Sequence, residues 1–83
     1  MEYNIAYKSS VKKDLKKIDK NESLRILHAI EDVLKKDPFK GKELKGEYEG
    51  LFSYRIGDYR IIYTILGSTI IILRISHRKD AYK

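Results

Sequence analysis

Cationic and aromatic side chains gather in the last third of the sequence. Arg55 and Arg60 flank a Gly-Asp pair, and residues 77–82 read His-Arg-Lys-Asp-Ala-Tyr. Guanidinium groups bind phosphate bidentately and stabilise charge that develops on a phosphoryl group, and a tyrosine ring can stack on a nucleic-acid base. Such a set could cleave RNA without a metal, with the 2′-hydroxyl as nucleophile. The same residues could also be solvated positions of a sheet and its tail.

Motifs for other kinds of catalysis are missing from the sequence. It contains no cysteine, no glycine-rich phosphate loop and no Gly-x-Ser-x-Gly turn. Its two histidines lie far apart and lack the spacing of metal ligands, and its acidic residues are scattered. We therefore expect neither a metal nor another cofactor.

Three short runs rich in isoleucine, tyrosine, leucine and threonine surround the cations and favour β-strands. They cover residues 51–56, 59–66 and 69–76, and Gly57-Asp58 and Gly67-Ser68 separate them. Glycine at the first position of a two-residue loop is typical of a type II′ hairpin turn. The sequence therefore predicts a three-stranded antiparallel meander.

Two-residue turns fix the register of the meander. The register then assigns each residue to a face, because cross-strand partners share a face and side chains alternate along a strand. Arg55 then pairs with Arg60, and Arg60 pairs with Ile75. One face is apolar and should be the floor of a core, apart from Arg74 near one end. The other face carries Arg55, Arg60 and His77 together with aliphatic side chains, and we expect it to be the working surface.

The first half of the chain predicts elements that cover this floor. Alternating apolar residues at positions 3, 5 and 7 predict a short edge strand. Ser9 or Ser10 can cap a first helix, whose apolar residues share one face. Asp19 and Glu22 have the spacing of a capping-box variant at the start of a second helix, which Pro38 follows. The short link between the helices predicts an antiparallel hairpin.

Residues 39–50 are rich in glycine and in charges of both signs. They predict a surface loop beside the meander, which either carries function or only connects. The expected element order is β-α-α-β-β-β, and the expected class is α+β. The N-terminal strand and helical hairpin pack against the three-stranded antiparallel meander within one domain, residues 1–83.

The chain carries a net charge of +6. A basic balance on a small domain is typical of proteins that bind a polyanion, although a lysine-rich solvated surface gives it too. The exterior of the first helix would carry Lys12, Lys13, Lys16 and Lys17, as contacts to an RNA backbone or as solvated residues. With no cysteine, no signal peptide and no apolar run of membrane length, we expect a cytoplasmic protein without membrane contact.

Three segments together resemble the RelE/ParE toxin superfamily of bacterial and archaeal toxin–antitoxin modules. They are Leu-Lys-Gly at residues 44–46, an Arg-x-Gly-Asp-Tyr-Arg core within residues 55–63, and His-Arg-Lys-x-x-Tyr at residues 77–82. The resemblance covers essentially the whole chain in size, element order and charge. The complete C-terminal pattern favours the RelE branch, because the gyrase-directed ParE branch generally lacks it.

The resemblance implies a type II toxin that acts as a ribosome-dependent mRNA endonuclease. Such toxins enter the ribosomal A site next to ribosomal RNA, cut the mRNA codon through 2′-hydroxyl attack, and so inhibit translation without a metal. A cognate antitoxin neutralises them, and the aliphatic side chains of the mixed face are candidates for that contact. Two alternatives stay open: a ParE-like toxin that inhibits DNA gyrase without nuclease activity, and a plain RNA-binding module.

Matching positions imply roles for individual residues. Arg60 matches the family arginine that contacts the scissile phosphate, and Arg78 matches the one that stabilises the transition state. Tyr82 matches the tyrosine that stacks on or orients an mRNA base. Arg55 occupies a commonly basic position, and Lys45 is a candidate phosphate contact.

The groups that transfer protons stay open, because the sequence departs from one family pattern. Some members carry lysines on the strand before the glycine turn, where this chain has Leu51 and Ser53. Other members use a glutamate of the preceding loop with a C-terminal histidine. We therefore predict His77 as general acid or base, with Glu47 as a weaker candidate for its partner.

Overall fold

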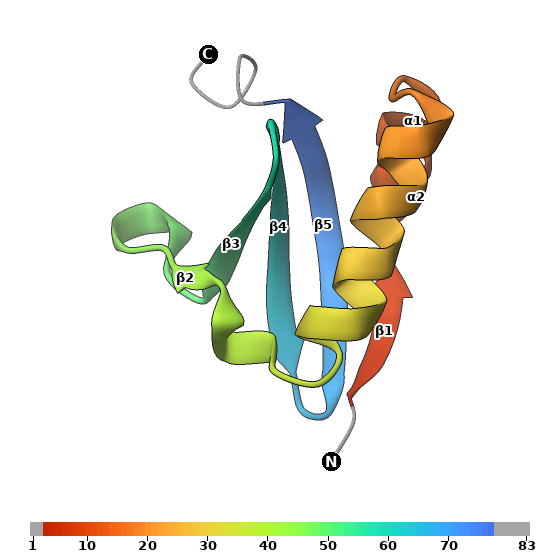
Figure 1. The fold of residues 1–83 in the computed structure, drawn as a ribbon. Helices are drawn as coiled ribbons and strands as arrows, with labels where there is room; N and C mark the ends of the chain where they lie inside the picture. Colours follow the sequence, from red (N-terminus) through yellow and green to blue (C-terminus); the bar gives the residue numbers. More distant parts are fainter. Residues whose placement is uncertain (1–2, 78–83) are drawn as a thin grey trace.

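The computed structural model describes residues 3–77 and contains a five-stranded sheet with helices along one face (Figure 1). The sheet order is β1-β5-β4-β3-β2, with β1 (Asn4–Tyr7), β2 (Lys42–Glu43), β3 (Leu51–Ile56), β4 (Tyr59–Leu66) and β5 (Thr69–His77). The helical hairpin consists of α1 (Ser9–Lys16) and α2 (Lys20–Ala29), and the π-helix η1 (Ile30–Leu34) continues α2. The predicted α+β class and the meander β3-β4-β5 are confirmed.

Two glycines turn the chain between the strands of the meander. Gly57 has a φ of 57° and Gly67 has a φ of 63°. Positive φ is confined to glycines among the described residues, so Asp58 and Ser68 do not share it. Positive φ at only the first of two loop residues is the sign pattern of a type II′ turn, as the sequence predicts.

Further strands extend both edges of the meander. β1 pairs with β5 in parallel, and the predicted edge position of the first strand is confirmed. β2 pairs antiparallel with β3, and it lies within the segment predicted as a polar loop. The same segment also contains the 3-10 turn η3 (Gly46–Tyr48) and most of the 3-10 turn η2 (Pro38–Lys40).

The register of β4 and β5 departs from the prediction at one point. The pairing shifts by one residue between Ile62 and Tyr63, which lie opposite Arg74 and Ile72. Leu73 is therefore an extra residue in β5, as in a β-bulge. Beyond such an insertion every side chain of the strand moves to the other face.

The shift reverses the predicted faces at the end of β5. Ile75 pairs with Ile61 on the helix side and is buried, whereas Arg74 is exposed on the opposite face. His77 pairs with Tyr59 and therefore also lies on the helix side. The predictions that Ile75 faces away from the core and that Arg74 lies on the apolar face are thus wrong.

The core lies between the helices and the helix-facing side of the sheet. Its buried side chains come from α1, α2, η1 and the three strands of the meander: Val11, Ile26, Ile30, Leu34, Phe52, Ile61, Tyr63, Ile70, Ile72 and Ile75. Burying one large apolar side chain contributes about 1.5–3 kcal/mol. The apolar face predicted for the meander forms the sheet side of this core, except at the end of β5.

The two helices begin in different ways. Asp19 caps α2 as predicted, because its carboxylate accepts a hydrogen bond from the Asn21 N–H at 3.1 Å. Neither predicted serine caps α1: Lys8 occupies the cap position without a side-chain hydrogen bond. The Ser10 hydroxyl instead binds the backbone of β5.

The buried Tyr63 hydroxyl fixes the segment after the helices to the sheet. It donates a hydrogen bond to the Pro38 carbonyl at 2.6 Å and accepts one from the Gly41 N–H at 3.2 Å. A Cβ at Gly41 would collide with this hydroxyl, so the close approach requires glycine. On the neighbouring residue of β4, the Thr64 hydroxyl donates to the Gly50 carbonyl at 2.8 Å.

Replacing Tyr63 by phenylalanine should destabilise the fold. The variant leaves the Pro38 carbonyl and the Gly41 N–H without their partner, which costs about 1–3 kcal/mol. Urea unfolding followed by circular dichroism measures this difference. Tyr48→Phe is the control because Tyr48 is 55% exposed. Equal unfolding free energies for both variants would contradict the role of the Tyr63 hydroxyl.

Alkaline pH should destabilise the wild type more than Tyr63→Phe. Burial raises the pKa of the Tyr63 phenol above 10.0, which outweighs the lowering effect of the Gly41 hydrogen bond. The unfolded chain therefore loses this proton first, so the contribution of Tyr63 is complete below about pH 10 and lost as pH rises through the folded pKa. Urea titrations from about pH 9 to about pH 11 test this, and parallel losses in both proteins would refute it.

Candidate functional site

Two arginines and a serine lie side by side on the sheet face opposite the helices. Arg55 pairs with Arg60 across the β3–β4 turn, as predicted, and Arg60 pairs with Ser76 rather than Ile75. The Arg55 Nε donates to the Gly57 carbonyl at 3.2 Å. Like charges directly opposite each other on a sheet repel, and a phosphate bound between the guanidinium groups would relieve that repulsion.

The register shift adds a third arginine to this face. Arg74 lies opposite Ile62 and two positions before Ser76, and its side chain is exposed. Uninterrupted alternation of side chains along β5 would put Arg74 on the apolar face, as the sequence predicts. No signal in the sequence marks Leu73 as the extra residue, so this cation was missed.

His77 lies on the helix side of the sheet and is partly buried. Its ring meets the Tyr59 ring edge-on, with a centroid distance of 5.2 Å and an interplanar angle of 87°. The prediction that His77 shares a face with Arg55 and Arg60 is therefore wrong, because the shift reverses the face. His77 still follows Ser76 directly, at the same end of the sheet as the two arginines.

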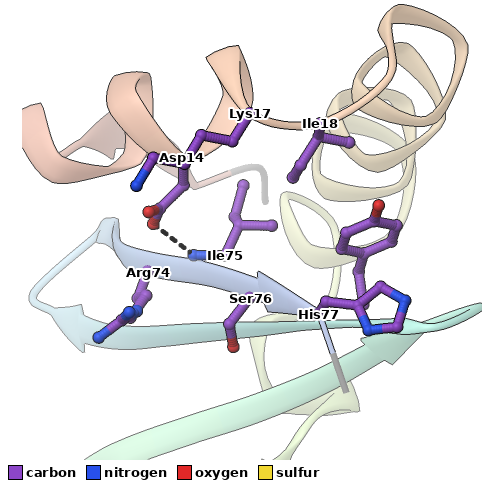
Figure 2. Close-up of a pocket in the computed structure, with 8 residues that line it drawn as sticks. Asp14, Lys17, Ile18, Arg74, Ile75, Ser76 and His77 are labelled. Atoms are coloured by element: carbon purple, nitrogen blue, oxygen red, sulfur yellow. Dashed lines mark hydrogen bonds between the residues drawn. The ribbon is translucent and has the colours of Figure 1, made fainter. Parts of the chain in front are cut away.

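His77 borders a pocket of about 300 Å³ between α1 and β5 (Figure 2). The pocket forms because β1 ends at Tyr7, opposite Ile72, and pairs with none of the later residues of β5. One wall comes from α1 and the other from β4 and β5. The lining residues are Asp14, Lys17, Ile18, Tyr59, Arg74, Ile75, Ser76 and His77.

Side chains of α1 take the place of β1 along this part of β5. The Asp14 carboxylate accepts a hydrogen bond from the Ile75 N–H at 3.1 Å (Figure 2), and the Ser10 hydroxyl donates to the Leu73 carbonyl at 3.1 Å. These bonds hold α1 at a fixed position against β5, because buried backbone groups need partners. Sequence reasoning missed Asp14, although its spacing of three from the buried Val11 puts it on the inner helical face.

The four predicted lysines, on α1 and directly after it, are exposed, and two of them line different cavities. Lys17 lines the pocket that His77 borders. Lys12 lines a separate groove of about 390 Å³, with Tyr7 and Leu27 among its other lining residues. Lys13 and Lys16 face solvent elsewhere on the helix. The structure therefore distinguishes Lys17 from its neighbours.

Lys45 and Glu47 lie at the far end of β3 from His77. Both precede Leu51, where β3 begins, and both are exposed. The six-residue strand β3 is about 20 Å long and ends at the turn beside His77. The carboxylate that shares a pocket with His77 is that of Asp14, so the arrangement does not bring Glu47 to the histidine.

Two predicted site residues, Arg78 and Tyr82, lie outside the described residues 3–77. Within that range, no group of three or more acidic or histidine side chains is arranged to hold a metal ion. The same range has no helix with the length and apolar character needed to cross a membrane.

Comparison with known sequences identifies related proteins. The family described as "ParE toxin of type II toxin-antitoxin system" matches residues 5–82 of this chain. The toxin RelG of Mycobacterium tuberculosis is 36% identical over 90 residues, which cover 100% of this chain and 99% of RelG. The toxin RelE3 of Methanocaldococcus jannaschii is 35% identical over 75 residues, which cover 84% of each chain.

Solved structures of toxins have the same fold. A chain of the toxin–antitoxin complex RelBE2 of M. tuberculosis has a TM-score of 0.89 and 31% identity, covering 94% of this chain and 100% of that chain. A chain of the RelB–RelE complex of Methanococcus jannaschii has a TM-score of 0.75 and 32% identity, covering 93% and 94%. Escherichia coli RelE, with 11% identity and a TM-score of 0.80, is similar in fold alone.

Removing the Asp14 carboxylate should loosen the end of β5. Asp14→Ala leaves the Ile75 N–H without its acceptor, which should cost about 1 kcal/mol or more and speed hydrogen exchange of that amide. Asp14→Asn is the matched control because its amide oxygen can still accept the bond. Amide exchange followed by NMR tests the prediction. An Ile75 amide equally protected in both variants would show that the tether is unimportant.

Proposed function

This chain belongs to the RelE/ParE family of type II toxin–antitoxin toxins, and from that membership we propose that it is a ribosome-dependent mRNA endonuclease. The proposed substrate is the mRNA codon in the ribosomal A site, and its cleavage would inhibit translation. The observation that carries the proposal is the pair Arg55 and Arg60 on the open face of the sheet, at the same end as His77 on the helix side.

The proposed reaction is attack of a 2′-hydroxyl on its own 3′-phosphate. The 2′-oxygen forms a bond to phosphorus, and the bond from phosphorus to the 5′-oxygen of the next nucleotide breaks. A base removes the proton of the 2′-hydroxyl, and an acid protonates the departing 5′-oxygen. The reaction needs cations for the phosphate and no metal ion, so the available residue types suit it.

Each predicted residue has a role in this scheme. Arg60 and Arg55 would hold the scissile phosphate, and Arg78 would stabilise the transition state. Tyr82 would stack on or orient an mRNA base. His77 would transfer a proton, because an imidazole can accept at one nitrogen and donate at the other.

The exposed lysines of α1 would contact ribosomal RNA. A row of cations on one helix can follow a phosphate backbone without reading sequence, and such binding weakens as salt rises. Lys12, Lys13 and Lys16 would act in this way, and Lys45 would add a phosphate contact near β2. Action on ribosomes would place the protein in the cytoplasm.

We expect a cognate antitoxin as the protein partner. Two similar toxins, one from M. tuberculosis and one from M. jannaschii, were solved in complexes with antitoxins. No helix covers the far face of this sheet within the described residues (Figure 1). That face carries the partly exposed Ile62, Ile71 and Leu73 and the 70% exposed Leu66. An antitoxin segment could cover these side chains.

A cleavage assay tests the proposed function. The protein, free of antitoxin, is added to ribosomes programmed with a defined mRNA, and primer extension maps the new 5′ ends. We expect ribosome-dependent cuts in the A-site codon, and a loss of about 10²–10³-fold in rate for Arg60→Ala and for Arg78→Ala, as for other groups that stabilise transition-state charge. Lys36→Gln, which removes one exposed positive charge elsewhere, should cut like the wild type.

Two outcomes would overturn this proposal. If the folded wild type cuts no mRNA and instead inhibits DNA supercoiling by gyrase, the chain is a toxin of the ParE type. If it neither cuts mRNA nor inhibits gyrase but binds RNA in a salt-dependent manner, it acts as an RNA-binding module.

A further inference from the structure

The pocket between α1 and β5 has an excess of positive charge beside His77. Lys17, directly after α1, borders the pocket on the helix side, and Arg74 belongs to its β5 wall, with its side chain on the sheet face away from α1 (Figure 2). Both side chains are exposed and therefore accessible to a ligand. Asp14 is the acidic residue among the described lining residues. One cation at the pocket and a second across the edge of β5 favour an anionic ligand that extends over both, such as a nucleic-acid backbone.

Asp14 has two opposing effects on this pocket. Its carboxylate accepts a hydrogen bond from the Ile75 N–H at 3.1 Å, and this bond holds the two walls together. Its negative charge at the same time disfavours an anion in the pocket beside Lys17. The structural effect and the electrostatic effect of Asp14 can be separated, because an asparagine keeps the acceptor and loses the charge.

We propose that this pocket binds an RNA phosphate next to the scissile phosphate, with Lys17 as its contact on the helix side and Arg74 as the contact where the RNA backbone leaves the pocket across the edge of β5. The inference rests on the proposed endonuclease function, since it extends the path of the RNA away from Arg60. Ser76, which pairs with Arg60, also lines the pocket. The volume of about 300 Å³ is at the small end of ligand sites and suits one phosphate with its sugar.

The uncovered edge of β5 gives this RNA strand a path between the two faces of the sheet. Asp14 on α1, and Lys17 and Ile18 directly after it, lie across the pocket from the β5 residues (Figure 2). Arg74 lies on the same sheet face as Arg60. An RNA strand that crosses the edge of β5 beyond the end of β1 therefore meets Lys17 first, then Arg74, and then Arg60.

The first test compares three variants that each remove one positive charge. Lys17→Gln and Arg74→Gln change the proposed RNA contacts. Lys36→Gln is the control, because this exposed lysine lies at the opposite end of the sheet, where the carbonyl of the neighbouring Lys35 accepts a hydrogen bond from the Tyr3 N–H. Fluorescence anisotropy measures binding of a short RNA with a 2′-deoxy nucleotide at the cleavage position. Cleavage on programmed ribosomes gives kcat and KM, and thermal melts confirm folding.

We expect each pocket variant to weaken RNA binding and to raise KM about tenfold, the usual effect of losing a hydrogen bond to a charged group. The kcat should change little, because a flanking phosphate is bound equally in the ground state and the transition state. Lys36→Gln should match the wild type. Pocket variants that also match the wild type would overturn the proposal.

Asp14→Asn gives a prediction of the opposite sign. It keeps an acceptor for the Ile75 N–H and removes the negative charge, so RNA binding should become tighter, by about threefold for a solvent-accessible charge. A folding defect cannot tighten binding, so this gain separates an electrostatic effect from structural damage. Unchanged or weaker binding would contradict the charge balance proposed for the pocket.

The two proposals can fail independently of each other. If the wild type cuts mRNA and Lys17→Gln and Arg74→Gln cut with unchanged KM, the phosphate subsite is wrong and the endonuclease function stands. If the wild type never cuts, yet RNA binding still depends on Lys17 and Arg74, the endonuclease function is wrong and the pocket remains a phosphate site.

Discussion

The one-residue shift between β4 and β5 determines which side chains meet at both faces of the sheet. With uninterrupted pairing, Arg74 would enter the core and Ile75 would face solvent. Burying an unpaired guanidinium group costs several kcal/mol, and exposing an isoleucine forfeits about 1.5–3 kcal/mol. The extra residue Leu73 avoids both penalties. It also creates the site, since it adds a third arginine to the open face and turns His77 toward α1.

The position of α1 depends on the same stretch of β5. β1 stops at Tyr7, and the backbone of β5 beyond that point binds Ser10 and Asp14 instead of a strand. A helix contact made through side chains leaves more room than a neighbouring strand, whose spacing is about 4.8 Å. The pocket beside His77 is the space that this exchange leaves. The early termination of β1 therefore determines where the pocket lies.

The sequence was a good guide wherever a local rule applied. Glycine spacing gave both turns, helical periodicity gave the hairpin, and the Arg55–Arg60 pair followed from the first turn. The predicted register failed after Ile72, because aliphatic residues occupy the consecutive positions 70–73 and no alternation marks an insertion. Sequence reasoning also failed for Glu47 and Asp14, because their distances from His77 depend on the length of β3 and on the termination of β1. Both are tertiary features that no short motif encodes.

The segment between the helices and β3 is attached to two consecutive residues of β4. Tyr63 binds Gly41 on the helix side, and Thr64 binds Gly50 on the opposite side. The loop between β2 and the Gly50 anchor can therefore change in length or composition without disturbing the meander, since doubling the length of a loop costs only about 0.6 kcal/mol. Residues 45–49 are thus a surface loop whose contacts could vary in evolution while the arginine face and its supports stay unchanged.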